Sequence, residues 1–173
     1  MPPDLDATAI LRVLARHRVR CVVVGAVAAQ MAGAALTTRD VDITPATTPE
    51  NLERLAAALA ELDAAIRTEH DSDPVPLPPD PRLLARGEIW NLTTRYGDLD
   101  VIVRPAATDG YEDLRRGSRS MEVGRGLVIS VASLEDVIRS KAASNRPKDH
   151  KVLPLLREAL ERSRAYDALD LDI

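Results

Sequence analysis

The amino-acid sequence predicts an α+β domain in which helices flank a mixed β-sheet and a helical pair ends the chain. Helix-like and strand-like segments alternate up to residue 62, two pairs of strand-like runs then occupy residues 88–131, and only helical spacing follows from residue 133. A chain of 173 residues fits one domain. We divide it into a core, residues 1–131, and a C-terminal helical lobe, residues 132–173, packed on that core as a single compact unit.

The first part of the chain should contain three helices separated by two short strands. In chain order these are a helix at 5–17, a strand at 20–24, a helix at 27–32, a strand at 41–44 and a helix that begins at Thr48. Gly33 and Pro45 end the segments that precede them. Thr48-Pro49-Glu50 indicates a helix start, because it supplies a hydroxyl cap, a proline at the first helical position and an early acid.

The second part should form two hairpins followed by two helices. The expected elements are strands at 88–96 and 99–103, strands at 119–123 and 127–131, a helix from Ser133 to about Asn145, and a helix after Pro147 to about Tyr166. The first hairpin turns at Tyr96-Gly97-Asp98 and the second about Gly124-Arg125-Gly126. Residues 73–81 contain five prolines, which predicts a loop without regular structure that either covers a site or simply connects two elements.

Composition excludes several classes of protein. The chain has one Trp, three Tyr and no Phe, which argues against binding nucleic acid by stacking bases on aromatic rings. Cys21 is the only cysteine, so no internal disulfide can form. The N-terminus lacks a signal sequence, and no apolar run approaches the ~20 residues that span a bilayer. We therefore expect a cytoplasmic protein that does not associate with membranes.

Three aspartates are the candidate metal ligands. Asp40 and Asp42 flank Val41 at the start of a strand, and alternation places both carboxylates on one face. Two neighbouring acids repel each other unless a cation joins them, and Mg²⁺ is the usual cation beside a phosphate. Asp100 lies among apolar residues of another strand, where a metal shared with Asp40 and Asp42 would provide its partner. Three acids on two strands suit a two-metal phosphoryl-transfer site, with Mn²⁺ as the alternative ion.

Neighbouring residues support a phosphate ligand. Gly25 ends the first strand, where backbone can approach a triphosphate closely. Thr37-Thr38 places two hydroxyls before the acids. Asp98 shares a face with Asp100, but because it adjoins the Gly97 turn we expect it to be solvated.

Although the net charge is −4, the C-terminal segment is basic, with eight Lys/Arg against three Asp/Glu between Arg139 and Arg164. Such a segment either holds a phosphate-rich ligand or forms a solvated helix surface. Lys141 ends the apolar stripe of the helix that starts at Ser133, from which it either reaches solvent or binds a phosphate. Arg146-Pro147-Lys148-Asp149 places two cations at the start of the last helix, where the helix dipole adds to anion attraction.

Taken together, these segments resemble the nucleotidyltransferase-β superfamily. The matching segments are residues 22–26, 37–43 and 97–102. Residues 131–141, followed by Arg146-Pro147-Lys148-Asp149, are similar to bacterial nucleotidyltransferase toxins of the MenT/AbiEii type. The resemblance covers roughly residues 20–155 and implies a nucleotidyltransferase-like sheet, with residues 1–131 as the catalytic core.

The resemblance also implies a role for each matching residue. The metal ligands would be Asp40, Asp42 and Asp100, and Asp100 would activate the attacking hydroxyl. Lys141 would be the fourth catalytic residue and contact the triphosphate. The nucleotide-binding residues would be Gly25, Ala26, Thr38, Lys141, Arg146 and Asp149. Ala26 departs from the pattern, which commonly has serine or a second glycine there, so backbone N–H groups or Thr38 would replace the missing hydroxyl.

The biological role implied by the resemblance is that of a toxin in a toxin–antitoxin pair. Such an enzyme transfers NMP from an NTP to the 3′ end of tRNA, and a cognate antitoxin protein silences it. In related toxins a partner phosphorylates a Ser or Thr just before the first aspartate, the place that Thr38 holds. Two alternatives stay open: the acceptor is a small molecule such as an aminoglycoside, or a protein hydroxyl; or the chain is an inactive antitoxin or binding module of the same fold.

Overall fold

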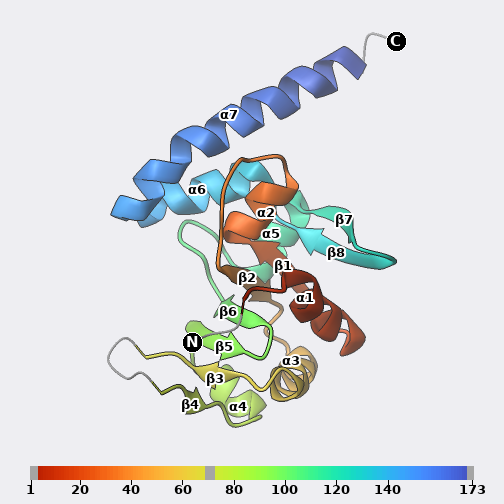
Figure 1. Ribbon diagram of the computed structural model, residues 1–173, viewed down its shortest axis with the longest axis vertical. Coiled ribbons are helices and arrows are strands. Elements are labelled where there is room, and N and C mark those ends of the chain that lie inside the picture. The colour runs from red at the N-terminus through yellow and green to blue at the C-terminus, as the bar shows by residue number, and fades with distance from the viewer. Residues whose placement is uncertain (1–3, 69–72, 171–173) are drawn as a thin grey trace.

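The computed structural model describes residues 4–68 and 73–170, and these form one eight-stranded mixed sheet with helices around it (Figure 1). The strands are β1 (Cys21–Val24), β2 (Asp40–Pro45), β3 (Ala65–Ile66), β4 (Val75–Pro76), β5 (Ile89–Thr94), β6 (Gly97–Ile102), β7 (Arg119–Val123) and β8 (Leu127–Val131). They are arranged in the order β4-β3-β5-β6-β2-β1-β8-β7. The predicted α+β class, a mixed sheet flanked by helices with a helical pair at the end of the chain, is confirmed.

The centre of the sheet is aliphatic on one face. β1 runs antiparallel to β2, and β2 runs parallel to β6, so these three strands lie side by side. Val41, Ile43 and Leu99 are fully buried. The residues between them on β2 and β6 are aspartates, which the strand alternation places on the opposite face. A well-packed apolar layer therefore supports a row of acids.

Helices flank this sheet. They are α1 (Ala7–Arg16), α2 (Gly25–Met31), α3 (Pro49–Glu61), α4 (Pro81–Leu84), α5 (Tyr111–Gly117), α6 (Leu134–Ser144) and α7 (Pro147–Asp170). Figure 1 shows α6 and α7 at one end of the molecule and α4, β3 and β4 at the other, with α7 extending past the sheet. Within residues 4–68 and 73–170, no helix has both the length and the apolar content that crossing a bilayer requires.

Capping explains where the predicted helices begin. The hydroxyls of Thr48 and Ser133 accept hydrogen bonds from the backbone N–H groups of Asn51 and Asp136, as expected for helix N-caps. Asn145 ends α6 in the left-handed conformation with φ 51°, so the chain turns there before Pro147 starts α7.

Several elements differ from the sequence-based expectation. The prediction that residues 73–81 have no regular structure is wrong: Val75–Pro76 form β4, and α4 starts at Pro81. Among the described residues β4 pairs with β3 alone, at the edge of the sheet, where proline is tolerated, and Asp80 caps α4. Neither β3 nor α5 was predicted, and α2 begins at Gly25 instead of residue 27. The first hairpin turns at Arg95-Tyr96, because Thr94 pairs with Gly97.

Candidate active site

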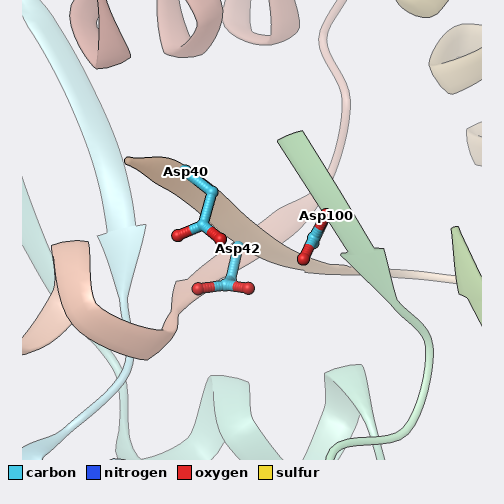
Figure 2. Close-up of side chains that lie close together, drawn as sticks. All are labelled: Asp40, Asp42 and Asp100. Carbon is cyan, nitrogen blue, oxygen red and sulfur yellow. The ribbon is translucent and has the colours of Figure 1, made fainter. Parts of the chain in front are cut away.

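Four aspartates form a two-by-two array on β2 and β6. The parallel register aligns Asp40 with Asp98 and Asp42 with Asp100. Each of Asp40, Asp42 and Asp100 offers one carboxylate oxygen, and these three atoms lie within 4.8 Å of one another. Figure 2 shows Asp40 and Asp42 on one strand and Asp100 facing them from the next. The three predicted metal ligands are therefore adjacent, and oxygen donors so grouped suit a hard divalent cation.

The electrostatics of Asp42 point to the same conclusion. Burial, followed by the charges of Asp40 and Asp100, raises the pKa of Asp42 to about 7, and the cations Lys141 and Lys148 only partly oppose this rise. Burial also raises the pKa of Asp100, with the Asp40 charge adding to the increase and Arg67 opposing it. A carboxylate that resists ionisation near neutral pH gains most from a bound cation, so the donor set fits a divalent metal.

Gly25 gives the array its tight geometry. β1 ends at Val24, which pairs with Asp42, and Gly25 follows with φ +67°. A Cβ on residue 25 would lie 2.1 Å from Asp42 Oδ2 and 2.8 Å from its Cγ. Glycine is therefore required here, both for its backbone conformation and for the approach of the acid. Ala26, the next residue, is half-buried and lines the larger of two cavities at the acids.

Thr38 contacts the first acid of the array. Its hydroxyl is 2.8 Å from Asp40 Oδ1, to which it donates, and it accepts a longer hydrogen bond from the Asp40 N–H at 3.4 Å. Thr38 thus orients Asp40 and lines neither cavity at the acids.

Cations of α6 and α7 face the acids. Asp149 is fully buried; its carboxylate accepts a hydrogen bond of 2.8 Å from Arg146 Nε and lies 3.6 Å from Lys141 Nζ. Burial alone would raise the pKa of Asp149, but the hydrogen bonds from the Arg146 side chain and backbone, together with the charges of Arg146 and Lys141, keep that pKa below its usual value. Asp149 is therefore an ionised anchor that holds both cations. Lys148 is exposed and has no carboxylate within 4 Å among residues 4–68 and 73–170.

Two adjoining cavities receive these groups. The larger, about 360 Å³, is lined by acids and cations together with Ala26, Ile89 and Asn91. The smaller shares Asp42, Ile102, Lys141 and Arg146 with it and adds Gly25 and an apolar wall that includes Val24 and Leu114. Every candidate site residue except Thr38 lines one of the two.

Arg67 is a site residue that the sequence did not reveal. Its Nη2 lies 2.5 Å from Asp100 Oδ1, and its Nη1 lies 3.0 Å from Asp98 Oδ2. The expectation that Asp98 is solvated is wrong, since its side chain is only 16% exposed and is paired with Arg67. No local pattern marks Arg67, because it directly follows the two-residue strand β3 and reaches β6 across β5.

Solved structures share this fold. Over 90% of both chains, a candidate nucleotidyltransferase from Thermotoga maritima superposes with a TM-score of 0.52 at 17% identity. The solution structure of the antibiotic-resistance factor ANT(2″)-Ia matches 95% of this chain and 93% of its own at 18% identity, with a TM-score of 0.52. A crystal structure of ANT(2″)-Ia in complex with adenylyl-2″-tobramycin matches 90% and 87% at 18% identity, with a TM-score of 0.53. No protein-family model and no curated protein sequence matches the chain. These likenesses show that the chain has the nucleotidyltransferase fold.

Proposed function

We propose that this protein is a metal-dependent nucleotidyltransferase that transfers NMP from an NTP to an acceptor hydroxyl and releases pyrophosphate. The observation that carries the proposal is the group of three aspartate oxygens within 4.8 Å of one another, in a cavity that Lys141 and Arg146 also line. Acids that can hold a cation and bases that can hold a triphosphate thus occupy one space. Positioning and electrostatic stabilisation are the main requirements of phosphoryl-transfer catalysis.

In the proposed site the aspartates would bind the metal ions, and one of them would also accept a proton. Asp40, Asp42 and Asp100 would hold two Mg²⁺ ions, or Mn²⁺ in their place. When bound, such ions neutralise negative charge on the transferred phosphate and on the leaving group. Asp100 would accept the proton of the acceptor hydroxyl while a bond forms from that oxygen to the α-phosphorus. The bond from the α-phosphorus to the bridging oxygen then breaks, and pyrophosphate leaves with the bonding electrons.

The nucleotide would lie between Gly25 and the helical lobe. The absence of a side chain at Gly25 leaves its backbone open to the triphosphate beside Asp42. Lys141 and Arg146, anchored by the buried Asp149, would bind the phosphate oxygens. At Ala26 the phosphates would bind backbone N–H groups, because the side chain offers no hydroxyl. Thr38 would act on the nucleotide site through Asp40.

We propose the 3′ end of tRNA as the acceptor, on the basis of the charges around the cavity. Asp149 is neutralised by Arg146 and Lys141, while Lys148 has no carboxylate within 4 Å in the described part of the chain. Apart from the three metal-site acids, the cavity therefore presents positive charge, which suits a polyanion. An aminoglycoside acceptor is the second candidate, because ANT(2″)-Ia carries adenylyl-2″-tobramycin in its crystal structure. A polycationic acceptor would favour free acids, and Asp149 is not free.

We further propose that the protein is the toxin of a toxin–antitoxin pair and that Thr38 is its control point. A phosphate on Thr38 would add nearly two negative charges where the hydroxyl now lies 2.8 Å from Asp40 Oδ1. That charge would repel the acid and compete with it for the cation. Mass spectrometry of protein co-produced with its cognate antitoxin should find Thr38 phosphorylated in the inactive pool; an inactive pool with unmodified Thr38 would contradict this control mechanism.

Label transfer tests the proposed activity and its acceptor together. Each of the four α-³²P-labelled NTPs is incubated with the protein and Mg²⁺ or Mn²⁺, in the presence of tRNA, protein or aminoglycosides. We expect label in tRNA from the wild type and none from Asp42→Asn. Label in an aminoglycoside or a protein would refute tRNA as the acceptor and support the proposed nucleotidyl transfer. Absence of transfer under all conditions, combined with growth arrest that persists in Asp42→Ala, would favour a binding module and refute the enzyme.

A further inference from the structure

Arg67 lies beside Asp98 and Asp100, the two aspartates of β6. Its two terminal nitrogens contact different carboxylates, Nη2 bonding Asp100 Oδ1 and Nη1 pairing with Asp98 Oδ2. Its backbone is fixed as well, because the Arg67 N–H donates to the Asn91 carbonyl at 2.9 Å. Asn91 in turn pairs with Asp100 across β5 and β6. The guanidinium is therefore held from the backbone side and from the Asp98 side before it reaches Asp100.

Asp98 has no evident function other than holding Arg67. It lies outside the group of three acids that could share a metal and lines neither cavity at the acids. Its Oδ1 is buried without a hydrogen-bond partner among the described residues, which is a cost that a solvated surface aspartate would not bear. Arg67 occupies only Oδ1 of Asp100, and Asp100 Oδ2 accepts no hydrogen bond from the described part of the chain.

We propose that Arg67 is a positioning residue for Asp100. Anchored by Asp98, its guanidinium fixes the rotation of the Asp100 carboxylate and leaves the second oxygen to the metal and the acceptor hydroxyl. Without the contact to Arg67, the three neighbouring carboxylates would repel the Asp100 carboxylate and turn it away from Asp42. The inference deepens the proposed function and rests on it.

The shape and the charge of the Arg67 guanidinium contribute differently to its contacts with Asp98 and Asp100, and a lysine at this position separates the two contributions. Arg67→Lys keeps the positive charge but replaces two separated nitrogens with a single ammonium, which cannot reproduce the forked contact. Loss of an outer partner of a metal ligand typically costs about 10–100-fold in metal affinity or activity. At constant charge, we expect Arg67→Lys to weaken Mn²⁺ binding and turnover by about tenfold, near the low end of that range.

The test compares Arg67→Lys with Arg95→Lys in the full chain. Arg95 makes the same kind of ion pair, with Asp63, in the turn that joins β5 and β6, and both partners are at least half exposed. Mn²⁺ binding is measured by water-proton relaxation without nucleotide, and KM for the NTP and kcat are measured at saturating Mn²⁺. We expect weaker Mn²⁺ binding and lower kcat with an unchanged KM for Arg67→Lys, and wild-type values for Arg95→Lys.

The possible outcomes separate this inference from the proposed function. If Arg67→Lys binds Mn²⁺ like the wild type while Asp42→Asn loses it, the metal site stands and the positioning role is refuted. Tighter Mn²⁺ binding by Arg67→Lys also refutes it, because Arg67 would then compete with the metal. If the wild type does not bind Mn²⁺, the proposed function fails together with the inference. If Arg67→Lys does not fold, Asp98→Asn, which keeps Arg67 but weakens its anchor, should show the same pattern with a smaller change, and wild-type Mn²⁺ binding by Asp98→Asn would refute the role.

Discussion

The raised pKa of Asp42 predicts that the metal-free protein loses stability as the pH rises. The pKa of Asp42 is about 7 in the folded chain and 3.8 ordinarily, a difference of about 3 units. The folded state therefore binds this proton more tightly than the unfolded state does. At about 1.4 kcal/mol for each unit, the free energy of unfolding should fall by about 4 kcal/mol as the pH rises from about 4 to about 7. The stabilising effect of the proton is complete below pH 4 and absent above pH 7.

Asp42→Asn should remove this dependence, because a neutral amide replaces the titrating group. In EDTA at pH 8 we expect the variant to be more stable than the wild type by as much as ~4 kcal/mol, which corresponds to a rise in Tm of roughly 8–16 °C for a chain of this size. Adding Mn²⁺ should reverse the order. The cation stabilises the ionised wild-type site at pH 8, stabilises it less at pH 5.5 where protons compete, and does little for the variant.

Thermal and urea unfolding across pH 4–9, with EDTA or Mn²⁺, measures these differences. Asp63→Asn is the matched control, because Asp63 is an exposed aspartate whose ion pair with Arg95 lies away from the acids. Subtracting the Asp42→Asn curve from the wild-type curve isolates the contribution of Asp42 from those of the other acids. Parallel curves for the two proteins in EDTA would refute the electrostatic reasoning, and an equal Mn²⁺ effect on both would refute the metal assignment.

Three further substitutions examine the walls of the site. Gly25→Ala should abolish nucleotidyl transfer and lower the free energy of unfolding by about 1–3 kcal/mol, because it combines a left-handed φ with a Cβ placed 2.1 Å from Asp42 Oδ2. Gly33→Ala is the control, since φ there is +92° but the space around the residue is open. It should lower stability in urea unfolding and retain transfer. Asp149→Ala should destabilise by about 1.5–3 kcal/mol, since it removes the charged acceptor of the Arg146 hydrogen bonds, and it should raise KM for the NTP in steady-state assays because Lys141 and Arg146 lose their anchor; little change in either would contradict the anchoring role. Lys148→Ala should raise KM for tRNA and reduce the salt dependence of that KM, while KM for the NTP stays within about twofold. Lys151 is also exposed, and Lys151→Ala should match the wild type. Equal effects of the two substitutions would argue against tRNA binding at the rim of the cavity.

The parts of the site that local patterns determine could be predicted from the sequence. Alternation along a strand places Asp40 and Asp42 opposite Val41 and Ile43 whatever the rest of the fold does, so the face of the acids was predictable. Capping at Ser133 likewise fixed the start of α6, and with it the position of Lys141 on that helix. These features depend on contacts within a few residues.

Features created by long-range contacts were not predictable in the same way. β3 is two residues long and exists because it pairs with β5 on one side and β4 on the other. α5 is a short helix that follows Gly110 at φ +81° and buries only Leu114, which gives too little periodicity to recognise. Val75–Pro76 of the proline-rich segment form a strand because they pair with β3 at the edge of the sheet.

Asp98 shows that the residues next to an aspartate in the sequence can suggest the wrong environment for its side chain. Beside the Gly97 turn, an aspartate is normally solvated, and nothing within the hairpin contradicts that expectation. The structure instead brings Arg67 from the far side of β5 and pairs it with Asp98 and Asp100 together. Four acids on one face of two strands would repel each other, so an array of this kind needs cations from outside its own strands. Arg67 supplies one at the Asp98–Asp100 side, while the Asp40–Asp42 side has no such guanidinium among the described residues. The asymmetry favours entry of the divalent cation at Asp40 and Asp42, where the charges of Lys141 and Lys148 only partly offset the negative charge.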